Sequence, residues 1–494
     1  MKTERILSFL ISSLLLASAA ACGESPSSPT APSGKADTAQ VTEAPEENET
    51  TAAEVRANVP DSDFDGFSYV IITKGNEGQN IKYYLNADAE SENGDTINDA
   101  IYRRNLTVED RFNVKISQFE PSDVAATLKK SVAAGDDAYQ FCIVSYASSY
   151  TLATGGYLLN MYDLQYFDTD AAWWDQDLKK QMTIAGKLFF DSGDIMLYDD
   201  MRVACSYFNK GLWENYGLEN PYDLVTSGKW IMDKMKELGS DVTSDIDGNG
   251  VLDQYDLWGI VSEDGGVSDF YHSAGLRQII NTGDTLEIEF GSEKAVEVGV
   301  RVIEFVSDKE NVFNANKIKA DDIWKYASQI FQEDRALIRT SCFENIPRDY
   351  RSMDTDFGVL PFPKYNETQD KYYTPVRADG YAASVPASVQ DPDRAAIIAE
   401  SLAAESYNFL KPAFYDISLQ GKVLRDNESE GMLDIIFGNK LYDIGYIFSI
   451  GGMTAALEGQ LSKKSPDVAS AMAKVKDKAQ TAVDKMVATF ESLG

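Results

Sequence analysis

The run Phe67-Ser-Tyr-Val-Ile-Ile-Thr73 is a nearly continuous series of apolar and β-branched residues. Such a run is typical of a strand that is buried on both faces of a parallel sheet. Apolar residues then recur at helical spacing over 97–112 and 122–134, and a strand-like run follows each segment, at 114–119 and 140–144. Strand, helix, strand, helix and strand in this order predict a parallel α/β sheet with right-handed crossovers.

A second α/β unit is predicted further along the chain. Residues 202–208 have the composition of a strand that runs into a helix at 210–216, and 256–261 that of another strand. Because 494 residues exceed what one hydrophobic core holds, we expect two lobes with several chain crossings between them. The predicted division is 63–165 for the first part of lobe 1, 166–335 for the first part of lobe 2, 336–408 for a return to lobe 1, and 409–494 for a C-terminal helical region mainly in lobe 2. Further helices are predicted at 292–307, 322–334, 393–410 and 465–492, and further strands at 336–339, 356–364 and 380–385.

The charge balance restricts the class of partner. The chain has 79 acidic and 45 basic residues, which give a formal net charge of −34. Nucleic acids and anionic lipid headgroups bind basic surfaces, so both are disfavoured as partners. The composition favours a soluble protein with a neutral or cationic partner.

The N-terminal segment predicts export. Lys2 and Arg5 precede an apolar and small-residue stretch at 6–21, which is too short to span a bilayer and suits a signal peptide. Cys22 follows small residues as in a bacterial lipobox, so residues 1–22 are predicted to be a lipoprotein signal with lipidation at Cys22; an ordinary signal peptide is the alternative. Residues 23–62 are rich in Ser, Pro, Thr, Ala and Glu, a composition typical of a disordered tether. The expected location is the extracellular face of the bacterial cell membrane.

Several segments together resemble a known family. They are Phe208-Asn-Lys-Gly-Leu-Trp-Glu-Asn-Tyr-Gly-Leu218, Asn220-Pro-Tyr-Asp-Leu-Val-Thr-Ser-Gly-Lys-Trp230, Phe357-Gly-Val-Leu-Pro-Phe-Pro-Lys-Tyr365, and Glu405-Ser-Tyr407 with Tyr415. In order and spacing, over about 66–490, the chain is similar to bacterial extracellular solute-binding lipoproteins, the receptor subunits of ABC importers, of the maltose-binding-like, carbohydrate-associated type.

The resemblance implies a fold and a function. The implied fold is the two-lobed α/β periplasmic-binding-protein-like fold (type II), in which lobes joined by a hinge, usually with three crossovers, close over a ligand. The implied partners are ABC permease subunits and a small solute, with carbohydrate as the expected class. The resemblance does not identify the solute.

The stretch 245–256, DIDGNGVLDQYD, matches a twelve-residue calcium loop. Calcium takes six to eight oxygen ligands, and alternate acidic side chains on a tightly turning loop supply them. The predicted ligands are Asp245, Asp247, Asn249, the Val251 carbonyl, Asp253 and Asp256, with Asp256 where a longer Glu is usual. An Asp/Gly turn without metal is the alternative. Because a strand and not a helix is predicted after the loop, a structural role is favoured over that of a sensor.

Aromatic and polar residues near predicted strand ends are candidates for the ligand cleft. Open α/β sheets bind ligands at the carboxyl ends of their strands, and sugars stack their CH faces on aromatic rings. The candidate ligand-binding residues are Lys74, Asn76, Tyr146, Trp173, Trp174, Tyr271, Arg377, Asp379 and Tyr381. Trp230 and Trp258 flank the calcium-like loop and are expected to be packing residues.

The residue inventory disfavours catalysis. The single histidine, His272, cannot supply a multi-histidine metal site and is expected at the surface or in the cleft. Cys142, Cys205 and Cys342 match no metal-ligand spacing and are expected to be buried free thiols. No Walker loop or nucleophile elbow is present. The prediction is a binding protein and not an enzyme; a secreted carbohydrate-active enzyme and a calcium-dependent surface scaffold are the alternatives.

Overall fold

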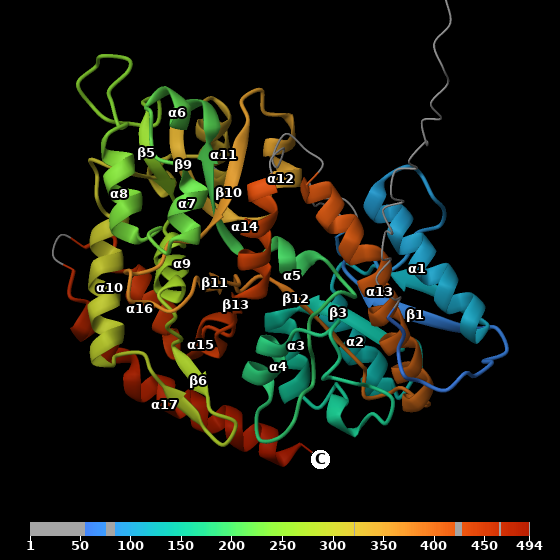
Figure 1. The fold of residues 1–494 in the computed structure, drawn as a ribbon. Coiled ribbons are helices and arrows are strands. Elements are labelled where there is room, and N and C mark those ends of the chain that lie inside the picture. Colours follow the sequence, from blue (N-terminus) through green and yellow to red (C-terminus); the bar gives the residue numbers. More distant parts are fainter. Residues whose placement is uncertain (1–54, 76–83, 321, 420–426, 464–465, 494) are drawn as a thin grey trace, which may run out of the picture. The chain divides into compact units, whose positions relative to one another are not determined.

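The computed structural model describes residues 55–75, 84–320, 322–419, 427–463 and 466–493 (Figure 1). These residues belong to one compact unit, Glu54–Gly494. Three predictions lie outside the described residues: the signal peptide with Cys22, the tether over 23–54, and the ligand contact of Asn76.

The first sheet contains the three predicted parallel strands. β1 pairs in parallel with β2 and β3, and β12 is added antiparallel to β3. Asp95 and Asp123 begin the two crossover helices by accepting backbone N–H bonds, as N-cap residues do. The elements are β1 (Phe67–Thr73), α1 (Thr96–Phe112), β2 (Val114–Phe119), α2 (Val124–Ala134), β3 (Phe141–Ser145), α3 (Tyr146–Thr154), η1 (Met161–Asp163), α4 (Gln176–Met182), α5 (Tyr198–Met201), β12 (Tyr381–Ser384) and α13 (Pro392–Leu419).

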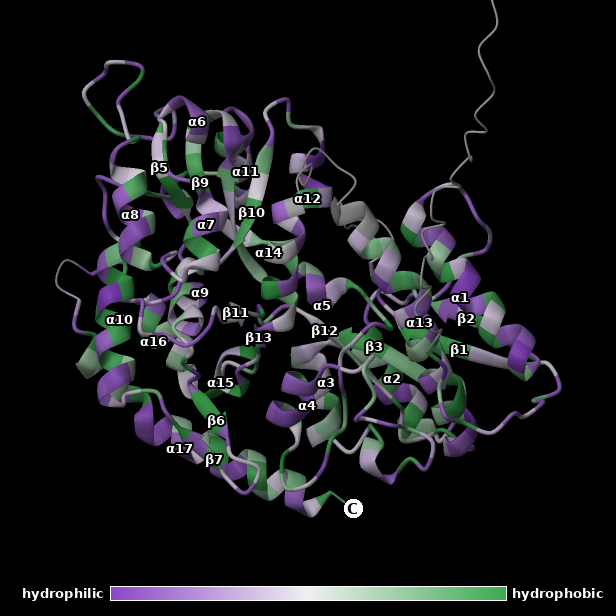
Figure 2. Cartoon of the chain, viewed as in Figure 1, coloured by the Kyte–Doolittle hydropathy of each residue, from purple (hydrophilic) through white to green (hydrophobic). Residues whose placement is uncertain are grey.

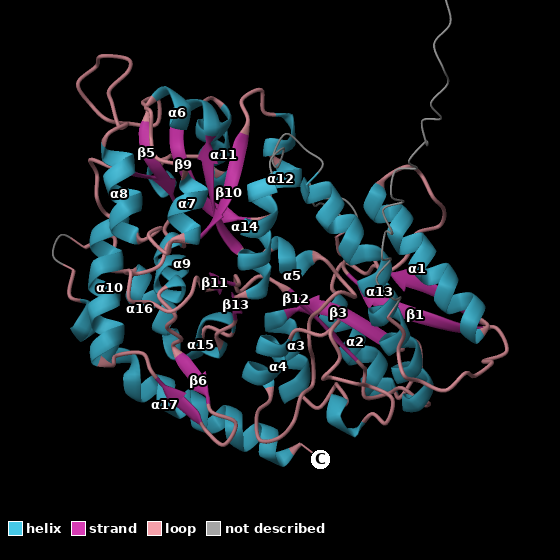
Figure 3. Cartoon of the chain, in the orientation of Figure 1, coloured by secondary structure: helices cyan, strands magenta, loops and turns pink. Residues whose placement is uncertain are grey.

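The second sheet is a separate group of strands in Figure 3, with the order β10-β4-β9-β5-β8. β5 is parallel to β8 and β9, whereas β4 is antiparallel to β9 and β10. Its elements are β4 (Ala204–Asn209), α6 (Lys210–Asn215), α7 (Pro221–Thr226), α8 (Met232–Ser240), β5 (Trp258–Ser262), α9 (Gly266–Ser273), α10 (Glu293–Val306), β8 (Val312–Asn314), η2 (Ala315–Lys317), α11 (Ile323–Gln332), β9 (Ala336–Cys342), α12 (Asn345–Arg348), η3 (Tyr350–Ser352) and β10 (Phe357–Pro361).

Both sheets are formed by apolar strands that helices cover. The strands of the two sheets are largely hydrophobic in Figure 2, while α8, α10 and α17 (Val468–Ser492) carry both hydrophilic and hydrophobic residues. α8 lies very close to β5, because a Cβ at Gly259 would be 2.1 Å from the carbonyl oxygen of Gly239. Glycine at both positions therefore lets the helix and the strand pack backbone to backbone.

The chain passes between the two sheets along three neighbouring segments. Val203 bridges Val376, and Arg377 N–H donates to the Arg202 carbonyl at 3.0 Å. β11 (Thr374–Pro375) pairs in parallel with β13 (Lys440–Leu441), which brings the third segment alongside. These three segments are the crossovers.

Two predicted lobe boundaries are wrong. Much of 166–201 belongs with the first sheet, since Asp191 bridges Ala383 in β12, α5 packs on β12, and Trp173 and Trp174 donate to Glu400 of α13. β9 and β10 pair within the second sheet, so the chain returns to the first sheet near residue 377 and not at residue 336. An apolar run has the same composition whichever sheet it joins, and only long-range pairing decides between them.

The C-terminal region contacts both lobes. α14 (Asn427–Gly438) packs against β10 and α16 (Met453–Glu458) against α9, while the Phe490 ring of α17 lies 5.4 Å from Phe189. The remaining elements are β6 (Ile279–Asn281), β7 (Leu286–Ile288), α14 (Asn427–Gly438), α15 (Ile444–Ile447), η4 (Ile450–Gly452), α16 (Met453–Glu458) and α17 (Val468–Ser492).

The folded part begins earlier than predicted. Val55 exchanges two backbone hydrogen bonds with the Asn408 side chain of α13, at 2.7 and 3.1 Å, and Ala57 is buried. Arg111 of α1 donates to the Val59 carbonyl at 3.2 Å. Residues 55–62, assigned to the tether from composition, therefore pack on the first lobe. No helix among the described residues has the length and apolar character needed to cross a membrane.

Candidate functional site

The candidate site is a cavity of about 580 Å³ at one edge of the second sheet, here called the strand-end cavity. Glu263 follows the carboxyl end of β5, and Glu344 follows that of β9. Because β5 and β9 are parallel, the two residues reach the same edge, where open α/β sheets bind ligands. The crossovers contribute Arg202 and 377–379. The residues that line it include Tyr198, Arg202, Glu263, Trp324, Glu344, Arg348, Arg377, Asp379 and Tyr446.

A chain of ion pairs crosses this cavity. Arg202 Nε and Nη2 donate to the two Asp379 carboxylate oxygens at 2.9 and 2.5 Å. The third nitrogen of Arg202 donates to Glu344 Oε2, and Arg348 Nη1 donates to Glu344 Oε1. Asp379 extends from the second crossover with 62% of its side chain exposed, whereas Glu344 is buried. The network therefore connects two crossovers with the end of β9.

A second pair lies deeper in the same wall. Arg339 donates to Glu263, and both side chains are buried. Burial raises the pKa of the Glu263 carboxyl, but the charges of Arg339 and Arg377 outweigh burial and lower it below its usual value. Glu263 is therefore ionised at neutral pH and has fixed positive neighbours.

Some groups in the cavity are free to meet a ligand. Arg377 Nη2 donates to Asp269 Oδ2 at 2.8 Å, while among the described residues Arg377 Nε and Nη1 have no hydrogen-bond partner. Trp324, in the first turn of α11, has 52% of its surface exposed. Guanidinium N–H groups, a carboxylate and an exposed indole are the groups that bind a polyhydroxylated ring through hydroxyls and CH faces.

The predicted ligand-binding residues are divided among several places. Arg377 and Asp379 line the strand-end cavity, and the half-buried Tyr381 lies next to it, with its ring 5.0 Å from that of Tyr198. Lys74 is exposed at the end of β1 and does not line this cavity. The prediction that Tyr146 and Tyr271 line the ligand cleft is wrong, because both side chains are fully buried.

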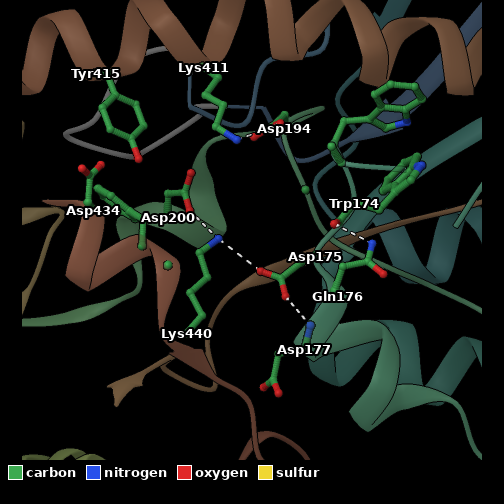
Figure 4. Close-up of a pocket in the computed structure, with 15 residues that line it drawn as sticks. Trp174, Asp175, Gln176, Asp177, Asp194, Asp200, Lys411, Tyr415, Asp434 and Lys440 are labelled. Carbon is green, nitrogen blue, oxygen red and sulfur yellow. Dashed lines mark hydrogen bonds and ion pairs between the residues drawn. The ribbon is translucent and has the colours of Figure 1, made fainter. Parts of the chain in front are cut away.

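Trp173 and Trp174 line a different cavity, of about 410 Å³, here called the acidic cavity (Figure 4). Their indole N–H groups donate to the two oxygens of Glu400 at 2.8 and 3.0 Å. Lys440 lies 3.3, 3.2 and 2.5 Å from Asp175, Asp199 and Asp200. Both tryptophans are buried and hold the loop on α13, so they present no free ring face.

Burial raises the pKa values of two carboxyl groups around the acidic cavity. Burial raises the pKa of Asp194 to about 7, against the opposing effect of Lys411 at 3.4 Å. Burial also raises the pKa of Glu400 to about 8, although the two indole donors lower it. Accessible polar groups such as Lys411, Tyr415 and Asp434 also line the acidic cavity. We assign the functional site to the strand-end cavity because it lies at the carboxyl ends of β5 and β9 and is lined by the exposed Trp324 and by Arg377.

The sequence analysis missed Arg202, Glu263, Trp324, Glu344, Arg348 and Tyr446. Glu263 follows the strand predicted at 256–261, which is a signal that could have found it. Glu344 was harder to find, because the predicted strand ends at 339 whereas β9 continues to Cys342. The prediction that His272 lies at the surface or in the cleft is wrong, because His272 is buried in α9 with Nδ1 2.9 Å from the Leu276 carbonyl. The expected packing of Trp230 and Trp258 is confirmed, as are three buried free cysteines, Cys142, Cys205 and Cys342.

The calcium-like loop lies between α8 and β5. Carboxylate oxygens of Asp245, Asp247 and Asp256 lie within 4.8 Å of one another. Asp256 is fully buried, and its two oxygens accept the backbone N–H groups of Ile246 and Asp253 at 3.0 and 2.8 Å. A bond from Gly250 N–H, together with one from Gly248, lowers the pKa of Asp245.

Three of the six predicted calcium ligands, Asp245, Asp247 and Asp256, converge in the loop. The three converging carboxylates fit a hard cation. The Asn249 and Asp253 oxygens instead accept N–H bonds from Val251 and Tyr255 at 2.7 and 2.8 Å, within the loop. The strand predicted after the loop is present as β5, and no second helix of an EF-hand follows.

Comparisons with known proteins identify the fold. No family model and no curated protein matches the sequence. A cyclo/maltodextrin-binding protein solved with maltotetraose superposes with a TM-score of 0.58 at 14% identity, covering 85% of this chain and 98% of its own. UspC of M. tuberculosis gives 0.55 at 16% identity, covering 84% and 100%. UgpB of Mycobacterium tuberculosis, solved with glycerophosphocholine, gives 0.52 at 14% identity, covering 78% and 95%.

These likenesses extend over most of the chain and confirm the predicted fold class. The protein has the two-lobed α/β fold of periplasmic-binding-protein-like structures. Among the neighbours with this fold are binding proteins rather than enzymes, such as the cyclo/maltodextrin-binding protein and an ABC substrate-binding protein, Lmo0181 of Listeria monocytogenes, solved with cycloalternan.

Proposed function

We propose that this chain is an extracellular substrate-binding protein that captures a sugar or oligosaccharide and delivers it to an ABC importer. The observation that carries the proposal is the strand-end cavity, which combines the exposed Trp324 face with the free donors of Arg377 and the exposed Asp379 carboxylate. Its place at the carboxyl ends of β5 and β9 supports the same function. The saccharides bound to structural neighbours of the same fold add further support.

Ligand capture is proposed to change the relation between the lobes. Arg202 and Asp379 belong to two neighbouring crossovers, and their ion pair lines the cavity. A ligand that binds both lobes stabilises the closed arrangement by its differential affinity for that state. Only the crossover segments need to change their backbone angles.

Membrane attachment and delivery complete the proposal. Cys22, acylated after signal cleavage, would anchor the protein on the extracellular face, and permease subunits would bind the closed form. The support is the sequence of residues 1–22 and the Ser- and Pro-rich composition of the following segment. A Cys22→Ser variant that stays in the membrane fraction would contradict the lipid anchor.

We also infer that the loop at 245–256 binds calcium in a structural role. The converging carboxylates of Asp245, Asp247 and Asp256 support this role, and calcium would add bonds that hold the loop closed. We expect the cation to take no part in ligand capture, because the loop lies at the amino end of β5 and the cavity at its carboxyl end.

Calorimetric titration against a panel of neutral mono- and oligosaccharides tests the main proposal. We expect one saccharide to bind with a saturable heat, and the same saccharide to lower the radius of gyration measured by solution X-ray scattering. Arg377→Gln should weaken binding, because it removes the free guanidinium donors. A panel without any binder, or turnover of a chromogenic glycoside that one carboxylate substitution abolishes, would contradict it.

A further inference from the structure

Glu344 holds two guanidinium groups at the wall of the strand-end cavity. Its Oε2 accepts from Arg202 Nη1 and its Oε1 from Arg348 Nη1, and the residue is buried at the carboxyl end of β9. Arg202 reaches it from the first crossover and Arg348 from α12. One carboxylate therefore fixes two arginines from different elements.

The other two nitrogens of each of these arginines also have a carboxylate partner. Arg202 gives its other two nitrogens to Asp379, and Arg348 gives Nε and Nη2 to Asp349. Arg377 retains free N–H groups, but the carboxylate of Asp269 lies 2.8 Å from it. Every guanidinium that lines the cavity is thus matched by a carboxylate of the chain.

This balance decides which ligand charge the cavity accepts. Guanidinium groups recognise carboxylates and phosphates through two parallel N–H bonds. In this cavity Arg202 and Arg348 already donate to Glu344, Asp379 and Asp349, so an anionic ligand that approaches them would face the carboxylates of Glu344 and Asp379. The formal net charge of −34 opposes the approach of anions as well.

We propose that Glu344 sets the charge specificity of the strand-end cavity. By neutralising Arg202 and Arg348 it makes the cavity select uncharged polyhydroxylated solutes and reject anionic ones such as uronates or phosphorylated sugars. This inference rests on the proposed function of the cavity and adds to it the class of solute that is excluded.

A matched pair of probes separates charge from shape. Trigalacturonate and its fully methyl-esterified form share one sugar skeleton, and sulfate is a small anion without sugar. Glu344→Gln keeps the side-chain size and removes the charge that holds both arginines. Asp379→Asn, at an exposed position, frees two donors of Arg202 alone and serves where the buried substitution prevents folding. Glu333→Gln removes the same charge from an exposed pair with Arg335 and is the control.

We expect wild-type protein and Glu333→Gln to give no saturable heat with sulfate or trigalacturonate. Glu344→Gln should give a saturable heat with the anions, with an affinity at least about tenfold above the weakest that the wild-type titration would detect, and this gain should fall at high salt. Asp379→Asn should show a smaller gain. A merely structural role of Glu344 would lower the melting temperature without creating anion binding.

Two results would overturn the inference. One is wild-type protein that binds trigalacturonate as tightly as Glu344→Gln does. The other is a folded Glu344→Gln, or a folded Asp379→Asn where the former does not fold, that gains no affinity for either anion. The proposed function fails separately, if no uncharged saccharide binds wild type, and the anion titrations then still decide the role of Glu344.

Discussion

Trp324 differs from four other tryptophans of the chain in the exposure of its ring to solvent. Trp230 and Trp258 are buried in the core of the second lobe, and Trp173 and Trp174 are held by Glu400. Trp324 is half exposed at the edge of the strand-end cavity. An exposed indole beside a cavity can stack on the CH face of a sugar ring, so Trp324 is the tryptophan that we expect to contact the proposed ligand.

Trp324→Ala is therefore expected to weaken saccharide binding without destabilising the fold. Truncation of a tryptophan that packs on a ligand costs about 2 kcal/mol of binding free energy, which corresponds to roughly a 30-fold loss of affinity. Calorimetry gives the affinity and thermal unfolding gives the stability. Tyr326→Ala is the matched control, because Tyr326 is similarly exposed on α11 but two residues away, on another face of the helix. Equal losses in both variants would remove Trp324 from the site.

At the scale of elements, β5 separates two sites. The loop at 245–256 precedes its amino end, and Glu263 follows its carboxyl end. Five strand residues span about 17 Å, so a change in the loop is transmitted to the cavity only through a rigid, fully buried strand. The loop is therefore expected to affect stability and not ligand affinity.

Calcium removal tests this separation. A chelator should lower the melting temperature, because a cation bound only by the folded chain stabilises it by mass action. Saccharide affinity should change less than about threefold. Asp247→Asn should abolish the calcium response, whereas Asp253→Asn should reduce it less, since the Asp253 carboxylate is not in the converging group. Loss of saccharide binding in a chelated protein that is still folded would contradict the structural role.

The elements were more predictable than the site. The strand at 67–73 and the helix expected at 97–112 are present as β1 and as α1 (Thr96–Phe112), because apolar periodicity is a local property. Glu263 and Glu344 share a cavity only because β5 pairs with β9, a long-range event that no local pattern encodes. Tyr146 shows the reverse error: it follows a strand end as expected, but Gly380 and Tyr442 cover its ring.

At the scale of the whole molecule, some of the many acidic side chains are buried and not at the surface. Burial raises the carboxyl pKa values of Glu400 and Asp194 to about 8 and about 7, and raises that of Asp191 well above its usual value. These groups lie near Trp173, Trp174 and the acidic cavity, where the first lobe meets the ends of α13 and α14. Their protonation therefore stabilises the packing of the first lobe, whereas the surface carboxylates mainly repel one another.

The sign of the pH dependence follows from these shifts. Between pH 4.5 and about 8, folded Glu400 retains a proton that the unfolded chain has released, so the free energy of unfolding falls as pH rises through this window. Below it, carboxylates with lowered pKa values such as Asp245 and Glu263 lose their contribution as they become protonated. We expect maximal thermal stability at about pH 5 to 6 and a lower melting temperature at about pH 8.

Glu400→Gln, which stays neutral and keeps the side-chain size, should flatten the decline, while Glu304→Gln at an exposed helix position should leave it unchanged. A melting temperature that rises steadily from pH 5 to pH 8 in wild-type protein would show that the carboxyl of Glu400 is ionised in the folded state, and the hydrogen bonds from Trp173 and Trp174 would then hold a buried charge.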